Sequence, residues 1–155
     1  KPIITIKENS IEKTNNSKYD SRILWNKCEP SLFCFYNELM EQRLIKKISE
    51  ENFLKHFKFI NSTSIKSKKN TIRICWIPSQ GKMMYLFTEL HSFEIIDFEG
   101  ESIYETIKDH FYNKSNTPFK YKSIKTANSD VRTEIKEGTM KYEFLDSIVA
   151  KILKY

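Results

Sequence analysis

Two stretches of this chain carry the same landmarks in the same order, and this internal repeat constrains the fold more than any other feature. The spacing from a Trp to a Glu-Leu pair to a pair of aliphatic residues is identical in both copies, whereas later landmarks drift by a few residues, as loop insertions produce. Chance apolar periodicity would match the Leu and Phe positions but not the ordered set, so we interpret 22–70 and 71–129 as two copies of one unit. The landmarks are Ile23-Leu24-Trp25, Glu38-Leu39, Leu44-Ile45, His56-Phe57 and Ser64-Ile65-Lys66 in the first copy, and Ile74-Cys75-Trp76, Glu89-Leu90, Ile95-Ile96, His110-Phe111 and Ser123-Ile124-Lys125 in the second.

Each copy begins with a run of β-branched and aromatic residues that predicts a short strand, at 22–25 and at 71–76. Apolar residues at helical spacing follow in each copy and predict a helix. Pro30 suits the first turn of the first of these helices, and Gly81 precedes the apolar face of the second. A second helix is expected from Ser49 and from Ser102, which can cap helix starts.

The segments outside the repeats are expected to form smaller elements. Residues 1–21 predict an edge strand at 3–6 followed by a polar loop, and 130–155 predict an amphipathic helix capped by Thr139. The apolar stripe of this helix must be buried, either against both repeats or in a homodimer. The residues of the homodimer alternative are Phe144, Leu145, Ile148, Val149 and Ile152.

The order of elements predicts the fold class. Only three Gly and four Pro interrupt the chain, which disfavours turn-rich sandwiches and barrels. Strand, helix, turn, helix and then a basic segment is the order of a winged-helix or helix-turn-helix unit. We therefore expect a mainly α (α+β) protein of two tandem winged-helix-like or helix-turn-helix-like repeats with short strands and a C-terminal amphipathic helix.

The basic residues gather in two segments that contain no acid, one in each copy. No Asp or Glu occurs between Glu51 and Glu89 or between Asp109 and Asp130, in a chain of net charge +6. A surface that faces phosphates requires such depletion, because a carboxylate would repel the nucleic-acid backbone. A solvated lysine-rich loop is the alternative for either segment alone. The candidate nucleic-acid-binding residues are Lys55, Lys58, Lys66, Lys68, Lys69, Arg73, Lys114, Lys120, Lys122 and Lys125.

The sequence contains no recognisable catalytic or metal-binding motif. A Gly-rich phosphate loop, a paired metal-ligand motif and a nucleophile elbow are all missing, so we expect no enzyme, no cofactor and no metal. His56 and His110 are expected to be structural, and Trp25 and Trp76 to anchor the core. The repeated glutamates Glu38 and Glu89 are expected to form salt bridges or caps.

Three cysteines without a Cys-x-x-Cys pair favour reduced thiols and a cytoplasmic location. No run approaches the roughly twenty apolar residues of a membrane span, so no membrane association is expected.

The run Leu24-Trp25-Asn26, followed by Phe35-Tyr36-Asn37-Glu38-Leu39-Met40-Glu41 and Leu44-Ile45, resembles a segment of small proteins from Bacteroidetes mobile elements. Among these, the chain is similar to the RteC-like regulators of Bacteroides conjugative transposons. The resemblance covers each repeat up to Ser64-Ile65-Lys66 and Ser123-Ile124-Lys125. It implies a helix-turn-helix or winged-helix DNA-binding protein linked to control of element excision.

The function expected from the sequence is therefore regulation through nucleic-acid binding, with duplex DNA ahead of RNA. In this hypothesis one DNA duplex is contacted by two segments, around Lys66 to Lys69 and around Lys120 to Lys125. The alternative is a protein-interaction adaptor that docks a partner through the apolar C-terminal helix.

Overall fold

The computed structural model describes residues 22–60, 72–98, 102–138 and 142–155. Within them the chain forms a mixed α/β fold of six helices and two small sheets. The expected strand at 3–6, the loop before 22, Lys66, Lys68, Lys69 and Thr139 lie outside the described residues. In chain order the elements are β2 (Ile23–Trp25), α2 (Glu29–Glu41), α3 (Glu50–Leu54), β3 (Phe57–Phe59), β4 (Ile74–Cys75), α4 (Gln80–Ser92), β5 (Ile96–Asp97), α5 (Ile103–His110), β6 (Phe111–Tyr112), α6 (Tyr121–Lys136) and α7 (Glu143–Leu153).

The two repeats form matching backbone hydrogen bonds. The Leu44 N–H donates to the Leu39 carbonyl after α2, and the Ile95 N–H donates to the Leu90 carbonyl after α4, both at 2.9 Å. The two donors are 51 residues apart in the sequence, and so are the two acceptors. The repetition visible in the sequence is therefore also a repetition of local structure.

Both long repeat helices end in the same backbone conformation. Arg43 follows α2 with φ of 57°, and Glu94 follows α4 with φ of 60°. A left-handed residue at this place ends a helix and redirects the chain, a role that glycine usually fills. The short extended segments 44–46 and 95–97 then run back towards the other repeat.

Strand pairing crosses between the repeats in a reciprocal way. Trp25 of β2 pairs antiparallel with Ile96 of β5, and Trp76 forms an antiparallel bridge with Ile45. The two pairs are related by exchange of equivalent residues, which is the pattern of a two-fold symmetric contact. The chain therefore folds as two interlocked repeats related by an approximate two-fold axis. The finer expectation of two winged-helix-like units stays a prediction.

Within each repeat the first strand also pairs with the last, and both pairings are parallel. Ile23 lies opposite Phe57 in the β2–β3 pair, and Ile74 lies opposite Phe111 in the β4–β6 pair. Because the residue before β3 is His56 and the residue before β6 is His110, the topology brings equivalent residues of both repeats to one place.

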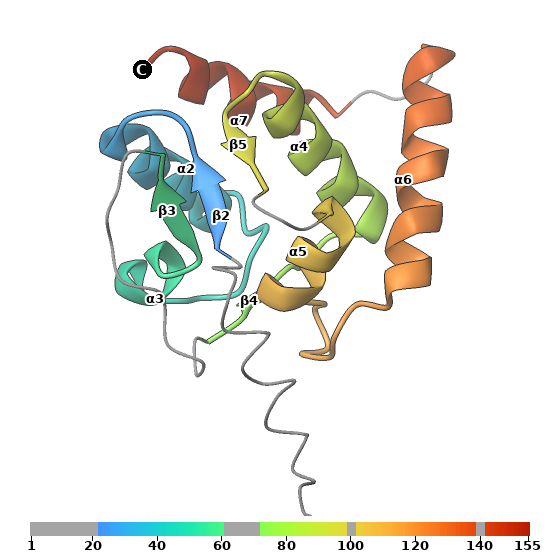
Figure 1. The fold of residues 1–155 in the computed structure, drawn as a ribbon, viewed down its shortest axis with the longest axis horizontal. Coiled ribbons are helices and arrows are strands. Elements are labelled where there is room, and N and C mark those ends of the chain that lie inside the picture. The colour runs from blue at the N-terminus through green and yellow to red at the C-terminus, as the bar shows by residue number, and fades with distance from the viewer. Residues whose placement is uncertain (1–21, 61–71, 99–101, 139–141) are drawn as a thin grey trace, which may run out of the picture.

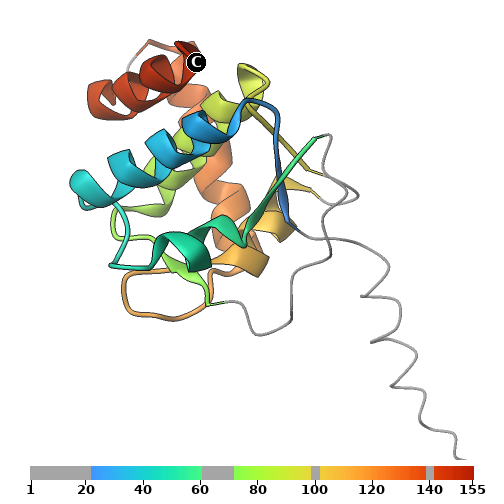
Figure 2. The ribbon, with the colours of Figure 1, turned by 90° about the vertical axis from the view of Figure 1, so that its left-hand side faces the viewer.

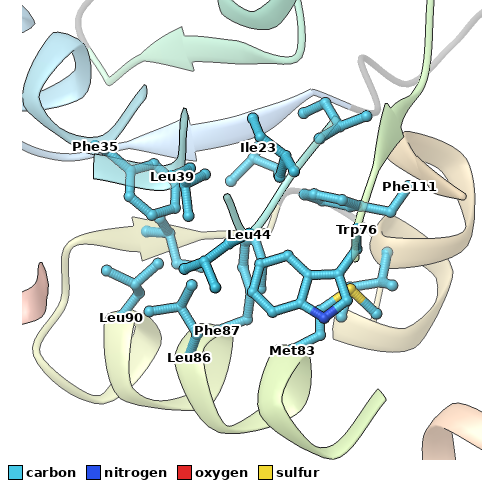
Figure 3. Close-up of a cluster of buried hydrophobic side chains, with 14 of the residues drawn as sticks. Ile23, Phe35, Leu39, Leu44, Trp76, Met83, Leu86, Phe87, Leu90 and Phe111 are labelled. Atoms are coloured by element: carbon cyan, nitrogen blue, oxygen red, sulfur yellow. The ribbon is translucent and has the colours of Figure 1, made fainter. Parts of the chain in front are cut away.

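One hydrophobic core serves both repeats. Figure 3 shows Phe35 and Leu39 of α2 facing Phe87 and Leu90 of α4, with Trp76 beside them. Trp25 and Trp76 are both fully buried, which confirms the prediction that they anchor the core. Burying an aromatic side chain of this size contributes about 2–3 kcal/mol before the cost of ordering it.

The helix starts follow the capping residues predicted from the sequence. The Ser49 hydroxyl accepts a hydrogen bond from the Asn52 N–H, and the Ser102 hydroxyl accepts one from the Glu105 N–H. The second long helix, α4, begins at Gln80 because Ser79 caps it, and Gly81 lies within its first turn.

The C-terminal helix α7 packs against the two repeats of its own chain. It lies against α2 of the first repeat and α4 of the second, as Figures 1 and 2 show. Leu145, Ile148, Val149 and Ile152 are buried there, and Phe144 is half-buried. The homodimer and adaptor alternatives both use this apolar stripe, which is covered here by α2 and α4, so the structure does not support them and both stay predictions. The prediction that it packs across both repeats is confirmed.

The elements of the two repeats extend to opposite ends of the molecule. In Figure 1, α3 and β3 lie at the left and α6 forms the right-hand edge, with α4 and α5 between them. In Figure 2, turned by 90°, α3 and β3 face the viewer and α6 lies behind α4. None of the helices in the four described ranges is both long and apolar enough to span a bilayer.

Candidate nucleic-acid interface

The exposed side of α6 carries the most concentrated basic surface found among the described helices. Lys122, Lys125, Arg132 and Lys136 are all exposed. Their spacings of three, seven and four residues place them along one side of a helix with 3.6 residues per turn. Within the described part of the chain none of the four forms an ion pair, so their charges are open to an external anion.

Short hydroxyl side chains lie between these cations. Thr126, Ser129 and Thr133 are exposed and fall on the same side of α6. The Thr133 hydroxyl donates to the Ser129 carbonyl at 3.1 Å. We call the seven residues Lys122, Lys125, Thr126, Ser129, Arg132, Thr133 and Lys136 the α6 basic face.

The acids of α6 lie beside the α6 basic face and not within it. Asp130 and Glu134 are four residues apart and follow the flank of the helix that also carries Ser123. Asp130 and Ser123 line a surface groove between α6 and the start of α4, with a volume of about 640 Å³. Lys120 and Lys122 line the same groove. A ligand on the α6 basic face would thus meet cations and hydroxyls before it met a carboxylate.

The buried side of α6 fixes the helix against the second repeat. Ile124 and Val131 are buried against α4 and α5. Between them Asn128, 4% exposed, accepts a hydrogen bond from the Thr88 hydroxyl at 3.3 Å and donates one to the Tyr104 hydroxyl at 2.9 Å. Because both amide atoms are paired, Asn128 fixes the rotation of α6 and so the direction in which the basic face points.

The structure separates the other predicted residues from the α6 basic face. Lys55 ends α3 and Lys58 lies in β3, at the opposite end of the molecule in Figure 1. The Arg73 guanidinium lies over the Tyr112 ring, 5.1 Å from its centroid, on the approach to β4. Lys114 is exposed in the turn between β6 and α6, and Lys120 is the residue that precedes α6.

The turn that carries Lys114 is held by one side chain. The Asn113 carboxamide oxygen accepts hydrogen bonds from the Ser115 N–H, the Thr117 N–H and the Thr117 hydroxyl, at 2.9–3.1 Å. This side-chain turn leads the chain from β6 into α6. Lys114 therefore has a defined backbone position, although its side chain extends into solvent.

Two residues of the α6 basic face, Arg132 and Lys136, are missed when acid-free runs are sought along the sequence. Asp130 ends the acid-free run and excludes them from it. Helical periodicity was the signal that would have included them, since Arg132 is seven residues after Lys125 and Lys136 is four residues further on.

The remaining polar residues support structure. Glu38, one of the two repeated glutamates, accepts a hydrogen bond and salt bridge from Lys151 of α7 at 3.0 Å, as its predicted role requires. Burial raises the pKa of its counterpart Glu89, and the nearby Asp146 raises it further. Cys28, Cys34 and Cys75 are free thiols. In the part of the chain that the structure describes, no group of three or more His, Cys, Asp or Glu could hold a metal ion.

Comparisons with protein-family models, with curated proteins and with solved structures return no match.

Proposed function

We propose that this chain binds nucleic acid, with duplex DNA ahead of RNA, through the α6 basic face. The observation that carries the proposal is a fixed helix with four exposed cations along one side and its carboxylates, Asp130 and Glu134, on the flank. Lysine and arginine that contact phosphates release condensed counterions, which is the main source of affinity for a duplex. A solvated lysine-rich surface would not require the cations to share one side of a helix.

The size and chemistry of α6 favour duplex DNA. An α-helix with its side chains is about 10–12 Å across, and the major groove of B-form DNA is about 12 Å wide. The deep, narrow major groove of A-form RNA does not admit a helix in this way. With α6 in the groove, the short Ser129 and Thr133 side chains let the helix approach the bases closely, so that their hydroxyls can contact base edges. Lys125 and Arg132 then contact phosphates.

The order of elements in the second repeat supports the same proposal. Helix α4, strand β5, helix α5, strand β6 and helix α6 follow one another, and apart from β6 this is the order helix, strand, helix and recognition helix of a winged-helix unit. In this interpretation α6 enters the groove, and the turn with Lys114 lies beside it. The resemblance to RteC-like regulators, which implies helix-turn-helix DNA binding, agrees with this assignment.

The test is fluorescence anisotropy of a labelled, mixed-sequence DNA duplex at low salt. Replacing Lys125 and Arg132 together (Lys125→Ala, Arg132→Ala) should weaken binding by about tenfold or more, equivalent to about 1.4 kcal/mol. The matched control, Lys47→Ala with Lys55→Ala, removes the same charge from exposed positions next to and at the end of α3.

Binding by the control variant should stay within about twofold of the unaltered chain, a difference of about 0.4 kcal/mol. An equal loss in both variants would mean that only net charge matters and would refute the assignment to α6. A duplex RNA of the same sequence should bind more weakly than the DNA, and equal binding would refute the groove assignment.

A further inference from the structure

The equivalent histidines of the two repeats form a hydrogen bond to each other. His56 precedes β3 and His110 ends α5 before β6, and their Nδ1 atoms are 2.7 Å apart. The two rings meet edge to face, with centroids 4.9 Å apart. The residues are 1% and 5% exposed, so water cannot replace this contact. The pair lies where the two repeats meet, and the two histidines are 54 residues apart in the sequence.

A backbone carbonyl determines which histidine donates. The second ring nitrogen of His56, Nε2, lies 2.6 Å from the Ile72 carbonyl oxygen. Because a carbonyl oxygen only accepts, this Nε2 carries the proton, and the neutral His56 ring presents a lone pair at Nδ1. His110 must then donate its own Nδ1–H to His56. Both of these hydrogen bonds form when the two rings are neutral.

Protonation of His56 at Nδ1 removes the bond, because it takes away the acceptor. A first extra proton on His110 leaves its Nδ1–H donated to His56 but places a charged imidazolium in a buried site. Two extra protons bring two N–H groups and two positive charges face to face at the 2.7 Å separation. The charged and titratable groups that act on the His56 ring are His110, at the end of α5, and Arg73, before β4, and both oppose its protonation.

We propose that His56 and His110 form a proton-sensitive latch that holds the two repeats together at neutral pH and releases them in acid. The residues next to the latch carry the strand pairing, since the Ile23 N–H donates to the His56 carbonyl at 2.8 Å. Opening the latch therefore loosens β3 from β2, and β6, which follows His110, from β4. This inference is independent of nucleic-acid binding.

The direction of the pH effect follows from the environment of His56. Burial, then the neighbouring His110, and also Arg73 lower the pKa of His56 from 6.5 to about 3, against the opposing effect of the Ile72 hydrogen bond. Between these two values the unfolded chain binds a proton that the folded chain does not bind. Stability should therefore be greatest above about pH 6.5 and should fall as the pH is lowered towards about 3.

The experiment compares the full chain with two histidine variants. Denaturant midpoints are measured at about pH 7.5 and about pH 5, a range that spans ordinary histidine titration. His110→Asn keeps a donor near the position of Nδ1 but removes one titratable ring and its effect on His56, so its midpoint should fall less than that of the unaltered chain. The control, His91→Asn, removes an exposed histidine outside the pair and should leave the fall unchanged.

A second measurement uses the unaltered chain and does not depend on whether a variant folds. Imidazole ¹⁵N spectra at neutral pH should show His56 with its proton on Nε2 and His110 with its proton on Nδ1. Exchange of the Ile23 amide hydrogen should accelerate as the pH falls, after correction for intrinsic exchange. An equal midpoint fall in all three chains, or a His56 ring that takes up a proton near pH 6.5 in the folded chain, would overturn the latch.

Discussion

At the scale of single residues, the two repeats keep the same tryptophan but satisfy its N–H differently. The Trp25 indole N–H donates to the Ser31 hydroxyl at 2.8 Å, whereas the Trp76 indole N–H donates to the Ser79 carbonyl at 2.9 Å. Ser31 is fully buried, and its hydroxyl donates a hydrogen bond to the Cys28 carbonyl oxygen at 2.6 Å. The first repeat therefore depends on a side chain where the second uses only backbone.

This difference predicts the effect of removing one hydroxyl. Ser31→Ala leaves the buried Trp25 indole N–H without its acceptor, which should cost about 1–3 kcal/mol in the free energy of unfolding. Denaturant unfolding measures that cost, and the indole ¹H–¹⁵N signals show its origin. The Trp25 signal should move and the Trp76 signal should stay in place. A variant as stable as the unaltered chain would show that this bond contributes nothing.

Residue roles that depend on type and local pattern could be predicted from the sequence, and roles that depend on pairing between repeats could not. The burial of Trp25 and Trp76 follows from their size and from the apolar residues beside them. The bond between His56 and His110 arises only because strands of the two repeats interlock. No periodicity within one repeat carries that information.

At the scale of elements, the helices and their capping serines were predictable because apolar spacing and capping chemistry are local. The composition of the α6 basic face was predicted only in part. Acid-free runs are counted along the chain, but a helix rotates by about 100° per residue, so Asp130 lies on the flank while Arg132 lies on the face. Charge patterns should therefore be judged on the helix surface.

The packing of α7 makes a second prediction about stability. Ile148 is fully buried against the repeats, so Ile148→Ala should lower the free energy of unfolding by about 2–5 kcal/mol through lost burial and the cavity left behind. Leu153, at the end of the same helix, is 41% exposed, and Leu153→Ala should cost clearly less. Equal costs in chemical unfolding would contradict the placement of α7.

At the scale of the whole molecule, helix α6 breaks the approximate two-fold arrangement of the repeats. The two repeats share backbone bonds, strand pairing and one core, yet α6, which begins in the second repeat and runs on to Lys136, has no counterpart among the described elements of the first repeat. In Figure 1, α3 and β3, which carry Lys55 at the end of α3 and Lys58 in β3, lie at the other end of the molecule from α6. In the proposed function, α6 therefore makes the duplex contact, and the first repeat supports the fold that holds it.

The most direct measurement is the salt dependence of duplex DNA binding, for the unaltered chain and for the chain with Lys125→Ala and Arg132→Ala. The logarithm of the binding constant should fall linearly with the logarithm of salt concentration, by about 0.9 per phosphate neutralised. Removing two phosphate contacts should make that slope shallower by about 2. Binding that ignores salt, or an identical slope in the two chains, would contradict the claim that the α6 basic face meets the nucleic-acid backbone.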